Sequence, residues 1–259
     1  MKKISLLIIL TLFLFACKKF EAKFSNLGDE GVQGELEELF KANTIDNFDV
    51  IINNLKNFNS TNEEAIVKGW EDLKMGPTDP YKYNEDYSEK SSKLNCREVA
   101  ALGILNSIDI KEADVKGSYL MFDKEDLETC AELKNVNKRK FYALFNEIEV
   151  PDTIKDPKAV KEYLQEALDK KNIVYKNDQV KLMLAYLHDK DSKSLFVGHA
   201  GLLFKKGKDY YFFEKLSSYE PYQLSKVRGE DEVAELFLSR YDLNDELGKP
   251  YVTVNGIVK

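Results

Sequence analysis

A histidine and a glutamate, residue types that can form a catalytic pair, lie in the segment LFVGHAGLLFKKGKDYYFFEKL, residues 195–216. The pattern predicts two strands joined by a tight turn at Gly207, which places Glu214 opposite Gly201. His199 shares a face with Gly201, so it lies on a diagonal from Glu214 at about 7–8 Å between backbones. A long carboxylate side chain can span that diagonal and orient the imidazole.

The same hairpin is apolar on both of its faces, which predicts a central and buried pair of strands. A buried glutamate is costly unless it is paired. His199 and Glu214 can therefore also be a purely structural pair, and the hairpin alone leaves both interpretations open.

A third reactive residue, Cys96, lies in the segment SKLNCREVAALGIL. The pattern predicts a helix that starts close to Asn95 and places Cys96 in its first turn. Free backbone N–H groups and the helix dipole favour a thiolate at that position. Together with His199 on one strand and Glu214 on the next, Cys96 gives the order nucleophile, base and orienting acid, provided that the fold brings the three together.

Other roles for the cysteines and for the second histidine stay open. Cys96 can be a small buried hydrophobe or one half of a disulfide with Cys130, which otherwise is a structural residue. His188, in AYLHDKDSK, is expected at the surface, with the role of base as its alternative. The chain has two histidines and neither CxxC nor HExxH spacing, so we expect no metal site and no cofactor.

The segments HAGLLFKKGKDYYFFE and NCREVAALGIL resemble the histidine-to-acid hairpin and the nucleophile helix of papain-like and transglutaminase-like proteins. In addition, NCR, FYALFNEIEV, VGHAGLLF, FFEKLSSYEPYQLSKV, LSRYD and PYVTVNGIV, in that order, resemble an uncharacterised family of bacterial lipoproteins known only as a domain of unknown function. This resemblance spans most of residues 90–258 and supplies no known substrate.

The papain-like resemblance implies that Cys96 is the nucleophile, His199 the general base and acid, and Glu214 the orienting group. The chain departs from that pattern in three respects. The third member of such triads is more often Asp or Asn, and no Gln stands just ahead of Cys96 to complete an oxyanion hole. The stretch between Cys96 and His199 is also longer than in compact transglutaminase-like domains.

Further residues are candidates for the oxyanion hole or for substrate binding. The backbone N–H of Cys96 and the Asn95 side chain are the nearest candidates for the oxyanion hole. A tyrosine of DPYKY is the alternative, at a distance before the cysteine that resembles NlpC-type cell-wall peptidases. The stretch KLSSYEPYQL can line a cleft or can be a connecting loop. The candidates are Asn95, Arg97, Tyr81, Tyr83, Tyr222 and Gln223.

The first residues, MKKISLLIILTLFLFAC, have the layout of an export signal, with two lysines, an apolar run and a small residue before Cys17. The run is shorter than the about 20 residues of a membrane span. LFAC resembles the lipobox of bacterial lipoproteins, which implies lipid (palmitate) on Cys17 and anchoring to the outer face of the cytoplasmic or outer membrane. An ordinary signal peptide with an incidental cysteine is the alternative.

Composition restricts the function classes. The chain has 259 residues, a formal net charge of −7 and 43% hydrophobic residues, which is typical of a folded globular domain. An acidic chain without clustered Lys and Arg is a poor match for nucleic acid. The lipobox and papain-like resemblances imply the membrane, through Cys17, and a peptide or cell-wall substrate as partners, while the oligomeric state stays open.

Helical patterns dominate the first half of the chain and strand patterns the second. Helices are expected over residues 31–43, 44–58 with Thr44 as N-cap, 60–73, 95–108, 156–171 and 231–242. Strands are expected over residues 117–122, 140–150, 180–187, 195–216 as a hairpin, and 250–257. We predict a signal peptide over 1–16, a tether over 17–30 and one α+β domain over 31–259, with helices packed on an antiparallel sheet in a papain-like or transglutaminase-like topology.

Two functions follow from these observations. The first is a membrane-anchored extracellular cysteine hydrolase or acyltransferase that attacks an amide bond, with cell-wall peptides as the nearest substrate by location. The second is a surface lipoprotein that binds a peptide or protein on a papain-like scaffold without turnover, since a fold does not fix a function. A redox pair of Cys96 and Cys130 is a third hypothesis.

Overall fold

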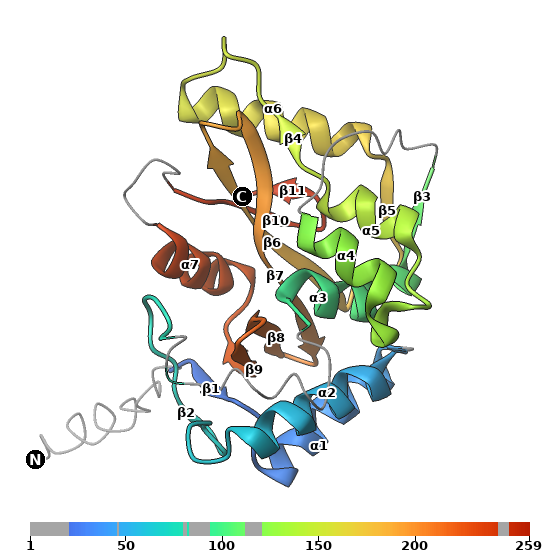
Figure 1. Ribbon diagram of the computed structural model, residues 1–259. Helices are drawn as coiled ribbons and strands as arrows, with labels where there is room; N and C mark the ends of the chain where they lie inside the picture. The colour runs from blue at the N-terminus through green and yellow to red at the C-terminus, as the bar shows by residue number, and fades with distance from the viewer. Residues whose placement is uncertain (1–20, 46, 80–81, 83–93, 112–120, 243–248) are drawn as a thin grey trace, which may run out of the picture.

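We describe a computed structural model of the chain (Figure 1), which places residues 21–45, 47–79, 82, 94–111, 121–242 and 249–259. In these residues, seven α-helices combine with a large antiparallel sheet. The helices are α1 (Glu30–Ala42), α2 (Phe48–Thr61), α3 (Cys96–Ile104), α4 (Met121–Thr129), α5 (Lys138–Phe145), α6 (Pro157–Lys170) and α7 (Glu230–Tyr241). Short 3₁₀ turns follow α3 and α4 at Leu105–Ser107 and Ala131–Leu133.

The main sheet has nine strands in the order β11-β10-β6-β7-β8-β9-β1-β2, with β4 paired to the end of β7. Its strands are β1 (Lys23–Ser25), β2 (Glu71–Asp72), β4 (Ile148–Glu149), β6 (Val180–Asp189), β7 (Ser194–Lys206), β8 (Asp209–Ser217), β9 (Glu220–Val227), β10 (Tyr251–Val254) and β11 (Ile257–Val258). A separate pair joins β3 (Ile108–Ile110) to β5 (Ile173–Tyr175). The expectation of helices combined with an antiparallel sheet is confirmed.

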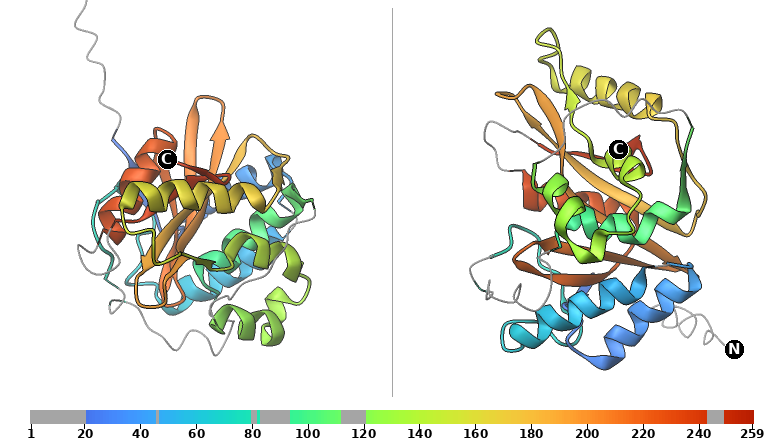
Figure 2. Two further views of the ribbon diagram at one scale, coloured as in Figure 1. Left: turned by 90° about the horizontal axis from the view of Figure 1, so that it is seen from above. Right: turned by 45° about the vertical axis from the view of Figure 1, so that its right-hand side comes forward.

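The main sheet is covered on both faces because β7 and β8 are apolar on both faces. On one face Leu203 and Phe212 pack with Phe237 of α7. On the other, Leu202 and Phe213 belong to a larger core that includes α3. Figures 1 and 2 show α7 on one side of the sheet and α3, α4 and α5 on the other, with α1 and α2 side by side near β8 and β9.

The predicted hairpin register is confirmed: Lys206 pairs with Asp209, and Glu214 lies opposite Gly201. Gly207 supplies the positive φ, +65°, that the turn requires. At Gly201 the sheet has no room for a side chain, because a Cβ would lie 2.4 Å from the Phe212 ring. This glycine allows the close packing of β7 on β8 beside the histidine.

Two of the predicted helix starts are confirmed and one is wrong. Asn95 caps α3, and Pro157 occupies the first turn of α6. Thr44 is not an N-cap, because its φ is +55° and α2 begins at Phe48, with Asn47 in the cap position.

The helix expected over residues 60–73 is wrong. The chain there runs along the N-terminal segment, where the Asn26 side chain accepts a hydrogen bond from the Val67 N–H at 3.0 Å. Further on, Glu71 pairs with Phe24 as part of β2. Pairing with a segment more than forty residues earlier overrides the local helical pattern, which Gly69 already weakens.

Two expected strands are also corrected. Most of 140–150 is helical, because Phe141, Leu144 and Phe145 bury one helical face and Asn137 caps α5 by accepting from the Lys140 N–H at 3.1 Å. Of 117–122, residues 117–120 lie outside the described residues, and Met121 begins a helix.

The segments expected as a tether and as a connecting loop contain strands of the main sheet. Residues 23–25 of the tether over 17–30 form β1, and residues 220–224 of the expected loop are the first part of β9. The two strands pair with each other, for example Phe24 with Ser225. The strand β1 could not be predicted locally because both of its partners, β2 and β9, are distant in the sequence. The strand β9 also pairs with the neighbouring β8 through a tight turn, which the prediction of a loop missed.

Candidate active site

Cys96 is the first residue of α3 and lies just below the surface, with 5% of its area exposed. The Asn95 side chain accepts hydrogen bonds from the N–H groups of Arg97, at 2.9 Å, and Glu98, at 3.2 Å. Glu98 in return accepts from the Asn95 N–H at 2.8 Å, which completes a capping box. The N–H of Cys96 itself is at the helix start, where no intrahelical acceptor exists.

The Cys96 thiol and the His199 imidazole lie beside each other, close enough for each to shift the pKa of the other. They meet where the sheet splits: the described pairing of β7 with β8 ends at Gly201, so at His199 the two strands have parted. The N–H of Ala200 is directed at the Cys96 sulfur. The start of α3 can therefore approach β7 at its free edge.

The environment of the sulfur favours a thiolate. Burial alone would raise the pKa of Cys96, but the imidazole of His199 and the guanidinium of Arg97 lower it below its usual value. Burial likewise opposes charge on His199, whereas the Cys96 thiolate and Glu214 raise the pKa of His199 to about 9. The two opposite shifts both favour a thiolate–imidazolium pair at this position.

Glu214 holds the far side of the imidazole. His199 Nε2 donates to Glu214 Oε2 at 2.7 Å, so Nδ1 is the ring nitrogen that remains for Cys96. The ring of Tyr241 stacks on the imidazole at 5.1 Å between centroids, and Phe237 meets it edge-on at 5.3 Å. The predicted order of nucleophile, base and acid corresponds to a connected chain of contacts.

Arg240 is a site residue that the sequence did not reveal. Its Nη1 donates to both carboxylate oxygens of Glu214, at 2.8 and 2.9 Å, and both side chains are buried. Gln223 Nε2 donates to Glu214 as well, at 3.1 Å. Burial would raise the pKa of Glu214, but Arg240 and His199 lower it, so the acid is ionised.

The sequence did contain a sign that Arg240 is buried. It follows Leu236 and Phe237 at helical spacing, on the buried face of α7.

Arg97 and Asp123 join α3, which begins at Cys96, to the strand β7, which holds His199. Arg97 donates to both oxygens of Asp123, at 2.7 and 2.8 Å, and to the backbone carbonyl of Val197 at 3.1 Å. The Asn95 amide also donates to Asp123, at 2.9 Å. Asn95 and Arg97, both proposed for the oxyanion hole or the substrate, are therefore used to fix α3 against α4 and β7.

The other candidates have different positions. Tyr222 is fully buried, stacks on Phe213, and donates from its hydroxyl to Asn54 at 2.7 Å, so it is a core residue and not a substrate-contact residue. Gln223 donates its hydrogen bond to Glu214, so it positions the acid. Tyr81, Tyr83 and the lipidation candidate Cys17 lie outside the described residues.

Lys215 is a second buried cation that the sequence analysis missed. Its ammonium donates to the carbonyls of Ser217, at 2.8 Å, and Glu220, and lies 4.4 Å from the centre of the Phe58 ring. Burial lowers the pKa of Lys215 to about 7, although Glu220 and Cys96 act in the opposite direction. In its charged form, Lys215 stabilises a thiolate at Cys96, but burial opposes that charge.

A cavity of about 260 Å³ reaches the site from the side of the acid. Its lining includes Gln223 and Arg240, which contact Glu214, together with residues 73–79. His199 is 1% exposed and Cys96 5%, so the pair itself lies below the surface.

A family model with the description "Domain of unknown function (DUF4300)" matches residues 23–258, which include every member of the Cys96 network. The chain belongs to this family. No curated protein and no solved structure matches the chain. The DUF4300 domain therefore begins at β1, which makes the first sheet strand part of the family unit.

In this DUF4300 chain the remaining sequence candidates lie apart from the Cys96 network. Cys96 and Cys130 are both free thiols, so the disulfide alternative is contradicted, and Cys130 donates to Glu132 at 3.3 Å. His188 lies near the end of β6, half-buried, and burial lowers its pKa. In the described part of the chain there is no cluster of three or more His, Cys, Asp or Glu suited to a metal, and no helix long and apolar enough to cross a membrane.

Proposed function

We propose that the protein is a cysteine hydrolase or acyltransferase of papain-like type, anchored at the outer face of a bacterial membrane, that acts on an amide bond. The observation that carries this proposal is the continuous contact chain from Cys96 through His199 to Glu214. The N-terminal layout and the lipobox-like Cys17 support the location, and cell-wall peptides are the nearest amide substrates there.

In this reaction the Cys96 thiolate attacks the carbonyl carbon of the amide, and the developing oxyanion lies near the Cys96 N–H at the start of α3. His199 gives its proton to the leaving amine as the C–N bond breaks, which leaves a thioester on Cys96. Water, deprotonated by His199, or an acceptor amine then attacks the thioester and releases the free thiol. Glu214 keeps the imidazole oriented throughout, and Arg240 keeps Glu214 ionised.

The burial of the pair favours a second candidate, a surface lipoprotein that binds a peptide or protein and has lost turnover. Cys96 and His199 are 5% and 1% exposed, so a substrate reaches them only after the covering residues move. Under this second candidate function, the contacts among Cys96, His199 and Glu214 only stabilise the fold.

Trapping of a thioester separates the two candidates. The full-length chain is incubated with solubilised cell-wall peptides and examined by mass spectrometry for an adduct on Cys96, with Cys130→Ser as matched control and Cys96→Ser as the variant. If the protein is an enzyme, new amine products appear and an adduct forms on Cys96. The Cys130→Ser variant still forms this adduct, and the Cys96→Ser variant does not. Binding of the peptides without products or adduct would instead support the second candidate.

A further inference from the structure

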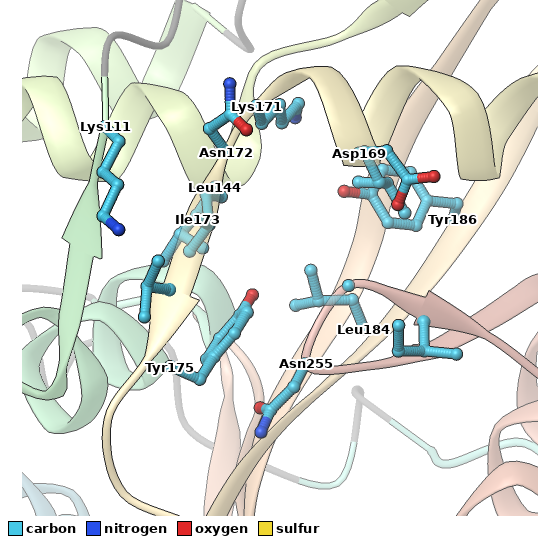
Figure 3. A pocket seen from close by; sticks show the side chains of 14 residues that line it. Lys111, Leu144, Asp169, Lys171, Asn172, Ile173, Tyr175, Leu184, Tyr186 and Asn255 are labelled. Carbon is cyan, nitrogen blue, oxygen red and sulfur yellow. The ribbon is translucent and has the colours of Figure 1, made fainter.

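A second cavity, of about 340 Å³, lies away from the Cys96 network. It is bounded by the end of α6, the strands β5 and β6, and the turn between β10 and β11 at Asn255 and Gly256 (Figure 3). No member of the proposed triad lines this cavity, so a ligand there would be bound independently of the proposed function.

The cavity combines an apolar wall with two unsatisfied polar groups. Leu144, Leu168 and Leu184 supply buried apolar side chains. Lys171 is 8% exposed and Tyr186 0%, and among the described residues neither Lys171 Nζ nor the Tyr186 hydroxyl has a hydrogen-bond partner.

Figure 3 shows the Tyr186 hydroxyl turned toward the middle of the hollow, with Lys171 at its upper end. The Tyr175 hydroxyl is also turned inward, from the opposite side (Figure 3). Three donors from two strands and a helix end therefore converge on one space, which an acceptor group of a ligand can occupy.

Unsatisfied buried donors are expensive to keep, because a polar group out of water without a partner loses its hydration free energy. Burial lowers the pKa of Lys171 to about 7, and no counter-charge from the described residues offsets that effect. An anion next to Lys171 would restore the charge and would accept from Tyr186 at the same time.

We propose that this cavity binds a small carboxylate with an apolar body, whose carboxylate accepts hydrogen bonds from Lys171 and Tyr186 while the body packs on the leucines. A single buried ammonium balances one negative charge. At the rim, the exposed charges of Lys111 and Asp169 have opposite signs, so they add no net attraction for a dianion such as phosphate. A monocarboxylate therefore matches the site better than a phosphate does.

Calorimetric titration of the full-length chain at about pH 6 tests this proposal, with 3-phenylpropionate and hexanoate as probes and 3-phenylpropanamide as the neutral analogue of the first. Lys171→Met and Tyr186→Phe remove one donor each at nearly constant shape. Lys170→Met, at the exposed neighbouring residue, is the matched control. Denaturant midpoints confirm that each variant is folded.

At least one carboxylate probe is expected to bind, and 3-phenylpropionate to bind about tenfold or more tightly than its amide. Lys171→Met is expected to lose about tenfold or more in affinity and Tyr186→Phe about threefold or more, while Lys170→Met matches the wild type. The proposal is overturned if neither probe binds, if the amide binds as tightly as the acid, or if a folded Lys171→Met variant keeps wild-type affinity. The last outcome would mean that Lys171 is only an interior lysine.

Discussion

Arg240 Nη1 lies 2.8 and 2.9 Å from the two carboxylate oxygens of Glu214, and both side chains are almost completely buried. The pair links α7 to the strand that holds the histidine's acid. Removal of one partner leaves an uncompensated buried charge, so Arg240→Met is expected to lower the free energy of unfolding by about 3–5 kcal/mol, measured by urea denaturation.

The matched control is Arg228→Met, because the Arg228 side chain is exposed and its partner Glu232, although buried, keeps the hydrogen bond from the Arg228 backbone N–H at 2.7 Å. That change should cost less than about 1 kcal/mol. Combination of Arg240→Met with Glu214→Gln should recover part of the loss, since the stranded carboxylate is gone. An Arg240→Met variant as stable as Arg228→Met would contradict the assigned role.

Glu98, in the capping box of α3, makes the stability pH-dependent. Burial and the neighbouring Asp126 raise the pKa of Glu98 to about 9 from its usual 4.5. Its contribution to stability is thus fully present below pH 4.5 and is lost as pH rises toward 9. The Glu98→Gln side chain can still accept the hydrogen bond from the Asn95 N–H, and because it cannot ionise it does not lose stability at high pH. It should stabilise the protein by about 1–3 kcal/mol at pH 8, and by less at pH 5.

The control for this prediction is Glu125→Gln on the exposed side of α4, which should leave stability unchanged at both pH values. Urea denaturation of the three proteins between pH 5 and pH 9 provides the comparison. If wild type and Glu98→Gln differ by the same amount at every pH, Glu98 titrates normally and the prediction is wrong.

Gly201 and Gly34 provide a matched pair of glycine substitutions. A Cβ at Gly201 would lie 2.4 Å from the Phe212 ring and 2.9 Å from the Phe213 carbonyl, whereas nothing lies within 4 Å of one at Gly34. Gly201→Ala should therefore destabilise by about 1–3 kcal/mol through overpacking. Gly34→Ala, within α1, should stabilise by up to about 1 kcal/mol. The same sign for both changes would refute the close packing of β7 on β8.

The pKa of His199 depends on Cys96. The thiolate is the largest influence that raises it to about 9, so Cys96→Ala should lower the pKa of His199 markedly, while Cys130→Ala should not. NMR titration of the ring protons measures this directly, because the chain has two histidines and His188 serves as internal reference. A His199 pKa that is identical in the two variants would exclude the ion pair.

The β7–β8 hairpin and the start of α3 could be predicted because their signals are local. A turn glycine at Gly207 fixes the register that sets Glu214 against Gly201, and the cap residue Asn95 fixes where α3 begins. Relative positions of two adjacent strands follow from counting residues once the turn is known. In the same way, the cap residue of a helix fixes which residues lie in its first turn, and so Asn95 places Cys96 there.

Other parts of the site depend on contacts between distant segments. Arg240 contacts Glu214 from a helix 26 residues later in the chain, and Asp123 likewise contacts Arg97 from 26 residues later. β1 and β9 pair across about two hundred residues, which local periodicity does not report. The sequence pattern over 140–150 was also ambiguous, because aromatic residues spaced for a helix face can resemble a strand.

The central claim, that Cys96 and His199 form a catalytic couple, is tested most directly by the pH dependence of iodoacetamide labelling at Cys96. Wild type is compared with His199→Ala, and Cys130 in the same chain serves as the ordinary thiol. The account predicts a labelling rate that titrates with a pKa well below about 8.5 at Cys96 and that shifts upward in His199→Ala. A Cys96 that is unreactive, or that titrates like Cys130 with or without His199, would contradict it.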